Sequence, residues 1–276
     1  MNFQLNLARP SQILFQLAAT LTWGHDQYKV TSKIRKCIFC LTTDETQFNT
    51  KEHILPESLG GEDWALLPDG LFCDSCQNKF GSTIEQQALA DYPFVNMRTI
   101  LGIPTKKKKA PWFNYWEGTI QAAGESGQIF YEPNNYFKKA FESGQKTLTI
   151  IPAMTKKPDM VLRTLLKIGL EVIAANDRDI VFEKRFDAAR EFALTGNKKY
   201  PWFYIQKEDT DLLNDYIQGK DWDDYHCFMD VQYEENGLVV LHLRTYYLQF
   251  LVPLLENVIL DPDNKSTEPE ERVITV

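Results

Sequence analysis

The sequence predicts an α+β protein in which a small, cysteine-rich N-terminal module precedes a domain of mixed helices and antiparallel sheet. Three observations lead to this prediction. Four cysteines form two Cys-x-x-Cys pairs, a long apolar helix follows in the second half, and two alternating runs flank an Asn-Gly turn. Hydrophobic residues (43%) and charged residues (25%) occur in ordinary proportions among the 276 residues. A chain of this length and composition can bury a sizeable core, and two modest domains are expected.

The two cysteine pairs form the strongest motif. Cys37 and Cys40 make the first pair, and Cys73 and Cys76 make the second. Four thiolates can bind one Zn²⁺ in the tetrahedral geometry of closed structural sites. Such pairs in a chain of this size indicate metal ligands in a reducing compartment rather than disulfides, so a cytoplasmic location is expected. The fifth cysteine, Cys227, lies far from the others in sequence and is interpreted as a buried apolar thiol.

The segment between the pairs carries groups suited to acid–base and metal chemistry. Glu52 and His53 stand side by side, and Gln77 and Asn78 directly follow the last cysteine. An imidazole accepts a proton near neutral pH, and carboxylate and amide oxygens bind hard divalent cations. These groups favour a metal-dependent nuclease over a simple zinc finger, which needs no Glu-His pair in its loop.

Taken together, these motifs resemble the HNH endonuclease superfamily over about residues 35–95. The resemblance rests on Cys37-Ile-Phe-Cys40, on Glu52-His-Ile-Leu-Pro-Glu-Ser-Leu-Gly-Gly61, and on Leu67-Pro-Asp-Gly-Leu-Phe-Cys73-Asp-Ser-Cys76-Gln-Asn-Lys-Phe-Gly81. It implies a zinc-bound ββα-metal module, in which a β-hairpin carries the histidine and the first turn of the following helix completes a metal site. It also implies an endonuclease that hydrolyses phosphodiester bonds, with DNA as the expected substrate.

The resemblance assigns a role to each candidate residue. It implies that His53 is the general base that deprotonates water, while Mg²⁺ or Mn²⁺ contacts the scissile phosphate and the cysteines hold a separate structural zinc. Glu52 is the candidate acidic ligand of the catalytic cation, and Gln77 and Asn78 are its candidate amide ligands. Neighbouring side chains in a regular strand point to opposite faces, so Glu52 and His53 serve together only if the strand bends. A surface glutamate is the alternative interpretation of Glu52.

Two positions depart from the family pattern. Gln77 stands where many members have His or Asn, and Pro68 stands where the family's central Asn orients the base. Asp69 or a backbone carbonyl can take over that orienting role. A second hypothesis therefore stays open, namely a zinc-ribbon module with weak or no catalysis that binds nucleic acid or protein. In a third hypothesis the second domain is a sensor or docking surface, and the chain is an effector, for example in bacterial defence against phage.

The charge distribution bears on the expected partners. The formal net charge is −8, whereas affinity for nucleic acid comes largely from Lys and Arg. The run Lys106, Lys107, Lys108 and Lys109 is either a phosphate contact or a solvated loop. A protein partner or a second copy, bound through the C-terminal domain, is also open. No apolar stretch reaches the roughly 18 residues that span a bilayer, so no membrane partner is expected.

The predicted organisation has five parts. They are a helical or irregular lead-in (1–30), the HNH module with structural zinc (31–101), a basic linker or loop (102–116), an α+β domain of unknown role (117–260) and an acidic disordered tail (261–276). Within the lead-in, the apolar run 13–21 favours an amphipathic helix. In the module, a four-residue apolar repeat through Phe80, Ile84 and Ala88 predicts a helix that ends near Tyr92.

The second domain carries clear local patterns. Short strands are expected at 119–122, 128–131 and 147–151, and helices over 158–175 and 180–194. In the first helix, Arg163, Lys167 and Glu171 form a single polar stripe on an otherwise apolar cylinder. Alternating runs on both sides of Asn236-Gly237 predict a β-hairpin.

Overall fold

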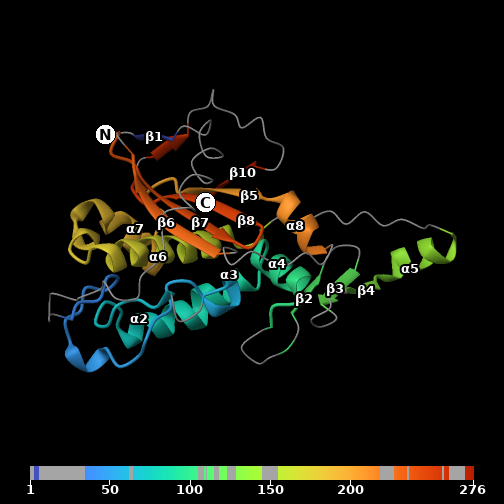
Figure 1. Cartoon of the computed structure of the whole chain (residues 1–276), viewed down its shortest axis with the longest axis horizontal. Coiled ribbons are helices and arrows are strands. Elements are labelled where there is room, and N and C mark those ends of the chain that lie inside the picture. Colours follow the sequence, from blue (N-terminus) through green and yellow to red (C-terminus); the bar gives the residue numbers. More distant parts are fainter. Residues whose placement is uncertain are drawn as a thin grey trace.

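The long helix α6 (Pro158–Asn176) forms the centre of the computed structural model of the chain, with a β-sheet on one side and the cysteine module on the other (Figure 1). The structure describes residues 3–5, 35–61, 65–104, 109, 111–114, 118–122, 129–144, 155–217, 227–234, 236–256, 258–260 and 271–276.

Helix α6 confirms the helix predicted from the apolar pattern. Pro158 starts it with a preset helical φ, and Asp159 complements the positive end of the helix dipole. Every residue from 161 to 175 is buried, including the three members of the predicted polar stripe. A Cβ added at Gly169 would lie 2.6 Å from Leu254 Cδ2, so the absence of a side chain there lets the helix approach the sheet closely. Because Arg163, Lys167 and Glu171 are all buried, the polar stripe of α6 faces the interior of the protein.

The sheet beside α6 is antiparallel, with the strand order β10-β5-β8-β7-β6. Its strands are β5 (Phe203–Glu208), β6 (Cys227–Tyr233), β7 (Val239–Thr245), β8 (Leu248–Pro253) and β10 (Glu271–Thr275). Strands β6 and β7 form the predicted hairpin. Gly237 has a φ of 87°, and the Asn236 side-chain oxygen accepts a hydrogen bond from Leu238 N at 2.8 Å. Turn chemistry thus sets the register of this pair, as expected.

Strand β10 differs from the predicted disordered tail. Residues 271–275 pair with β5, and Val276 N donates to Trp202 O at 2.8 Å. The tail is acidic on average, but its last residues include Val273, Ile274 and Thr275, whose branched side chains favour extended backbone. The prediction was wrong for these residues because it averaged composition over the whole segment. Residues 261–270 lie outside the described ranges.

The second predicted helix is interrupted. Two 3-10 turns, Ile180–Phe182 and Lys184–Phe186, precede α7 (Asp187–Thr195), with Glu183 extended between them. Helix α7 ends at Thr195, and its C-cap Gly196 has a left-handed φ of 74°. Helix α8 (Thr210–Ile217) follows β5.

The chain between the module and α6 forms a smaller antiparallel sheet. It has the order β2-β3-β4, with β2 (Trp112–Asn114), β3 (Gly118–Ala122), β4 (Ile129–Pro133) and the following α5 (Asn135–Glu142). The predicted strands near 119–122 and 128–131 are confirmed, whereas the expected linker contains β2. The strand predicted at 147–151 and the apolar run 13–21 lie outside the described ranges. Within the lead-in, β1 (Phe3–Leu5) pairs in parallel with β9 (Val258–Leu260).

The cysteine module contains a long helical segment after its last cysteine pair. This segment comprises α2 (Asp74–Lys79), a π-helical turn (Phe80–Glu85, labelled η4) and α3 (Gln86–Leu89), and α4 (Phe94–Leu101) follows it. Phe80, Ile84 and Ala88 are fully buried, so the predicted helix is confirmed. The module also has two 3-10 turns, Glu45–Gln47 and Glu57–Leu59.

One buried core joins the module to the rest of the molecule. Side chains of the module, of α6 and of the large sheet belong to the same hydrophobic cluster. Hydrogen bonds also cross between the module and the elements that follow it, and three of them reach Ile38 and Leu59. Arg190 Nε donates to Ile38 O at 2.5 Å, and both Thr245 Oγ1 (2.5 Å) and Cys227 Sγ (3.3 Å) donate to Leu59 O. No helix in the described part of the chain is long and apolar enough to cross a membrane.

Candidate functional site

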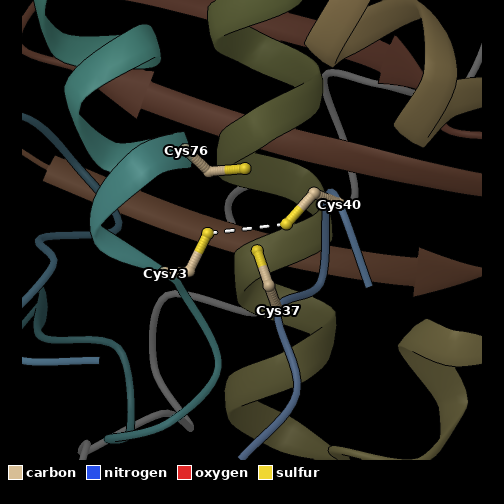
Figure 2. Close-up of side chains that lie close together, drawn as sticks. All are labelled: Cys37, Cys40, Cys73 and Cys76. Carbon is tan, nitrogen blue, oxygen red and sulfur yellow. Dashed lines mark hydrogen bonds between the residues drawn. The ribbon is translucent and has the colours of Figure 1, made fainter. Parts of the chain in front are cut away.

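Four cysteine side chains meet at one point of the module. Cys37 and Cys40 lie in the turn that opens it, Cys73 is the N-cap of α2, and Cys76 lies in the first turns of that helix (Figure 2). The four sulfur atoms all lie within 4.8 Å of one another, and Cys40 Sγ and Cys73 Sγ are 3.5 Å apart. Within the described ranges, no other group of three or more Cys, His, Asp or Glu ligands is arranged to hold an ion.

This donor set fits Zn²⁺. Four sulfurs at the usual Zn–S distance in a tetrahedron are about 3.8 Å apart, close to the spacing found here. A hydrogen bond from Cys76 lowers the pKa of Cys37 to about 5, whereas burial raises the pKa of Cys73 to about 12. The hydrogen bond with Cys37, together with burial, raises the pKa of Cys76 as well. Four thiolates this close repel one another, and a divalent cation offsets that repulsion.

Packing and backbone hydrogen bonds hold the cysteine loops in place. Lys36 N donates to Gly70 O and Ile38 N donates to Leu71 O, both at 2.9 Å, and these contacts join the two cysteine segments. Behind them, three aromatic rings pack together, with centroids 4.6–5.9 Å apart. These rings belong to Phe39, Phe72 and Phe80. Backbone hydrogen bonds between the two cysteine segments and a small aromatic core therefore hold the four cysteines in place.

His53 lies on a short antiparallel pairing rather than on a long hairpin. It forms a bridge with Leu66, flanked by a hydrogen bond from Ile54 N to Ala65 O (2.7 Å) and another from Leu67 N to Glu52 O (2.8 Å). The side chain of His53 is half-buried. Among the described residues, no hydrogen bond to its imidazole is found. The expected order of paired strands followed by a helix is present in a minimal form.

Side chains of helix α2 form hydrogen bonds with the residues that precede His53 in the chain. The Gln77 side-chain nitrogen donates to Lys51 O at 2.7 Å, so its amide oxygen stays available for a cation. One turn earlier, the Asp74 carboxylate accepts four hydrogen bonds from Asn49 and Thr50 at 2.6–3.1 Å. The side-chain hydrogen bond from Thr50, followed by that from Asn49, lowers the pKa of Asp74. The first turn of the helix therefore positions the segment that leads into His53.

The other candidates are less engaged. Asn78 is exposed, and its backbone carbonyl accepts a hydrogen bond from Ser82 Oγ at 2.5 Å. Asp69, the candidate replacement for the orienting Asn, is exposed in the turn, and no contact joins it to His53 within the described ranges. Of the two amide candidates, Gln77 is the one that hydrogen-bonds to the His53 strand. The choice between them as metal ligands stays a prediction.

Glu52 points into a buried ionic cluster. Lys167 Nζ lies 2.6 Å from Glu52 Oε1, 2.9 Å from Glu85 Oε1 and 3.1 Å from Glu171 Oε2. The same ammonium donates to the backbone oxygen of His53 at 3.4 Å. The Lys167 side chain is fully buried, and Glu52 is only 9% exposed. Glu52 is therefore not a surface glutamate, and its carboxylate already has a cationic partner.

The charges of this cluster are strongly coupled. Burial by itself lowers the pKa of Lys167, but the three nearby carboxylates together raise it well above its usual range. Burial raises the pKa of Glu171, and the charges of Glu52 and Glu85 add to this effect against the opposing influence of Lys167. The lysine stays protonated, and Glu171 is a carboxyl that readily takes up a proton.

Sequence reasoning found the cysteines, Glu52 and His53, but not the partners of the cluster. The polar stripe of α6 is the sequence feature that indicates such a cluster, because charged side chains on a buried helix need polar or charged partners. The partners themselves lie far away in sequence, and no local spacing identifies them.

The comparison with known families agrees with this geometry. Residues 37–93 match the model of a family described as HNH endonuclease. The predicted resemblance is thus confirmed for these residues, which form an HNH module with a cysteine cluster suited to zinc. No curated protein and no solved structure matches the chain significantly.

Proposed function

We propose that this chain is a metal-dependent endonuclease that hydrolyses phosphodiester bonds in DNA. The main support is the family match over residues 37–93, which includes both cysteine pairs and the Glu-His motif. The strand and helix around His53 have the arrangement that the family resemblance implies. In this proposal His53 Nδ1 or Nε2 takes the proton from the attacking water.

The metal chemistry of the proposal rests on oxygen donors from the His53 strand and from helix α2. Gln77, Asn78 and Glu52 are the side chains that would hold Mg²⁺ or Mn²⁺. The bound cation supplies positive charge that offsets charge developing on the phosphate and the leaving 3′-oxygen. Glu52 can take part only by sharing its carboxylate with Lys167 or by leaving it, because the two are 2.6 Å apart. Gln77 is the stronger candidate, since its amide nitrogen is already fixed on the Lys51 carbonyl.

The direct test is incubation of the purified protein with supercoiled plasmid and either Mg²⁺ or Mn²⁺. Nicked or linear plasmid is the expected product, and chelation of the divalent ion should stop its formation. His53→Ala protein prepared in the same way controls for contaminating nucleases. DNA binding without cleavage under every metal condition would favour the zinc-ribbon binding module instead. Two observations support that second candidate, namely the ion pair of Glu52 and the lack of an orienting partner for His53 among the described residues.

Gln77→Ala and Asn78→Ala are expected to differ from each other. The residue that binds the catalytic cation should show a raised Mg²⁺ requirement, partly rescued at higher Mg²⁺, because one oxygen ligand is removed. We expect this for Gln77, whereas Asn78→Ala should cleave nearly as the parent does. Cleavage rates across a Mg²⁺ titration give the measurement. The opposite pattern would assign the cation to Asn78.

The lysine run supplies a further expected result. Lys106, Lys107 and Lys108 lie outside the described ranges, and Lys109 is exposed. If the run binds phosphate, changing all four lysines to alanine should weaken DNA binding and reduce the salt slope by about 0.9 for each phosphate that is no longer neutralised. Fluorescence anisotropy at several salt concentrations measures both quantities. A K184A/K198A variant, which removes exposed lysines elsewhere, is the control. Unchanged affinity and slope would favour the solvated loop.

A further inference from the structure

Helix α6 reaches the proposed nuclease centre through one buried side chain. Lys167 Nζ contacts the strand that carries His53 at two points, the Glu52 carboxylate at 2.6 Å and the His53 carbonyl at 3.4 Å. It also contacts Glu85, at the end of the π-helical turn, at 2.9 Å. The ammonium lies 5.7 Å from the centroid of the Phe72 ring, next to the zinc-type ligand Cys73. One group from outside the module thus touches the histidine strand, the module helix and the second cysteine segment.

Burying the Lys167 ammonium costs free energy unless its lost hydration is replaced by protein contacts. An ammonium with no solvent exposure loses its hydration, and only charged or polar partners at hydrogen-bond distance offset that loss. Lys167 has four such partners, three carboxylates and one carbonyl. Because the carbonyl belongs to His53 itself, the ammonium restrains the backbone from which the imidazole projects. A flexible surface lysine has no comparable effect, because it keeps its water.

We propose that Lys167 is a positioning residue for His53, so that helix α6 completes the nuclease centre and the HNH module is not self-sufficient. This inference rests on the proposed function, in which His53 acts as the base. The strand of His53 is held by few backbone hydrogen bonds, and its imidazole has no partner among the described residues. Helix α2 holds the residues before the strand, and Lys167 adds restraint at the strand itself, where it binds Glu52 and the His53 carbonyl. A misplacement of about 1 Å at a reacting group costs roughly 10²-fold in rate.

The test needs a variant that removes the ammonium without leaving a carboxylate that has no solvent exposure and no cationic partner. Glu171 is fully buried, whereas the side chains of Glu52 and Glu85 keep 10% and 15% of their exposure. The double variant K167M/E171Q therefore neutralises the deepest carboxyl together with the lysine. Its matched control is E171Q, in which Lys167 keeps its contacts with Glu52, Glu85 and the His53 carbonyl. The two proteins differ only at the ammonium.

We expect kcat for plasmid cleavage to be about 10²-fold lower in K167M/E171Q than in E171Q, with KM for DNA and zinc content unchanged. Addition of H53A to each protein distinguishes positioning from general loss of structure. If Lys167 acts through His53, the H53A background should abolish the effect of K167M, because interacting residues are not additive. A loss that adds fully to that of H53A, or that comes with zinc release, would overturn the proposal.

Amide hydrogen exchange gives a readout that does not need catalysis. The amides of Ile54 and Leu67, which flank His53, should exchange faster in K167M/E171Q than in E171Q, while amides of the β6–β7 hairpin should not change. Equal exchange in the two proteins would overturn the proposal. If the parent never cuts DNA, the proposed function fails, but this experiment still decides whether Lys167 holds the strand. Should K167M/E171Q fail to fold, K167Q/E171Q, with a polar side chain one bond shorter, replaces it in every comparison.

Discussion

Replacing His53 with alanine is expected to slow plasmid cleavage by about 10²- to 10⁴-fold, the usual contribution of a positioned general base. The substitution should leave the fold intact, because the strand is paired through the backbone of Glu52, Ile54, Ala65 and Leu67. His53 is also separate from the four cysteines, so zinc content should stay the same. Initial cleavage rates at saturating Mg²⁺, measured beside DNA affinity, separate a catalytic loss from a binding loss.

Glu57→Ala is a suitable control for this experiment. Glu57 is exposed in the 3-10 turn after Pro56, and no contact joins it to another described side chain. Its replacement should cleave at the parent rate. A His53→Ala protein that cuts as fast as the parent would exclude His53 as the base, whatever the fold of the module.

Replacing Cys73 with serine is expected to release the zinc and unfold the module. Structural zinc contributes about 10–16 kcal/mol in small zinc-finger peptides at neutral pH, as much as the whole stability of an ordinary domain, about 5–15 kcal/mol. Cys73 is also the N-cap of α2 and makes no side-chain capping hydrogen bond there, so serine keeps that position compatible with the helix and the expected loss comes from the missing zinc ligand. Elemental analysis should give about one zinc per parent chain and much less in the variant, and thermal unfolding should show an early transition.

Cys227→Ser is the matched control for the zinc experiment. Cys227 lies outside the cluster and donates a hydrogen bond to Leu59 O, which a serine hydroxyl can also donate. This variant should keep both its zinc and its melting temperature close to those of the parent. Parent protein purified without chelator that contains no zinc would contradict the assignment of the cluster.

Features with a local cause were predictable from the sequence. The apolar repeat of α6, the Asn236-Gly237 turn and the spacing of the cysteine pairs each act over a few residues, and the structure confirms all three. The π-helical turn within 74–89 was not predicted, since an apolar repeat of four residues does not distinguish it from regular helix.

Features that depend on distant partners were not predictable. The interior position of Lys167 follows from partners such as the His53 carbonyl, 114 residues earlier in the chain. Taken locally, the stripe of α6 shows only that charged groups share one face. Strand β10 is a similar case. It is a short β-branched run within an acidic segment, and its partner strand, β5, lies far upstream in the sequence.

The hydrogen bonds that join the cysteine module to α7, β6 and β7 also affect the order in which the chain folds. They span 152, 168 and 186 residues. At ordinary rates of synthesis, α6 leaves the ribosome on the order of ten seconds after the module does. During that interval the apolar side of the module has no protein partner, while all its zinc-type ligands are already present. Zinc and the small aromatic core of Phe39, Phe72 and Phe80 are therefore the stabilising groups available early, and we expect a shortage of zinc to favour aggregation of nascent chains over folded, inactive protein.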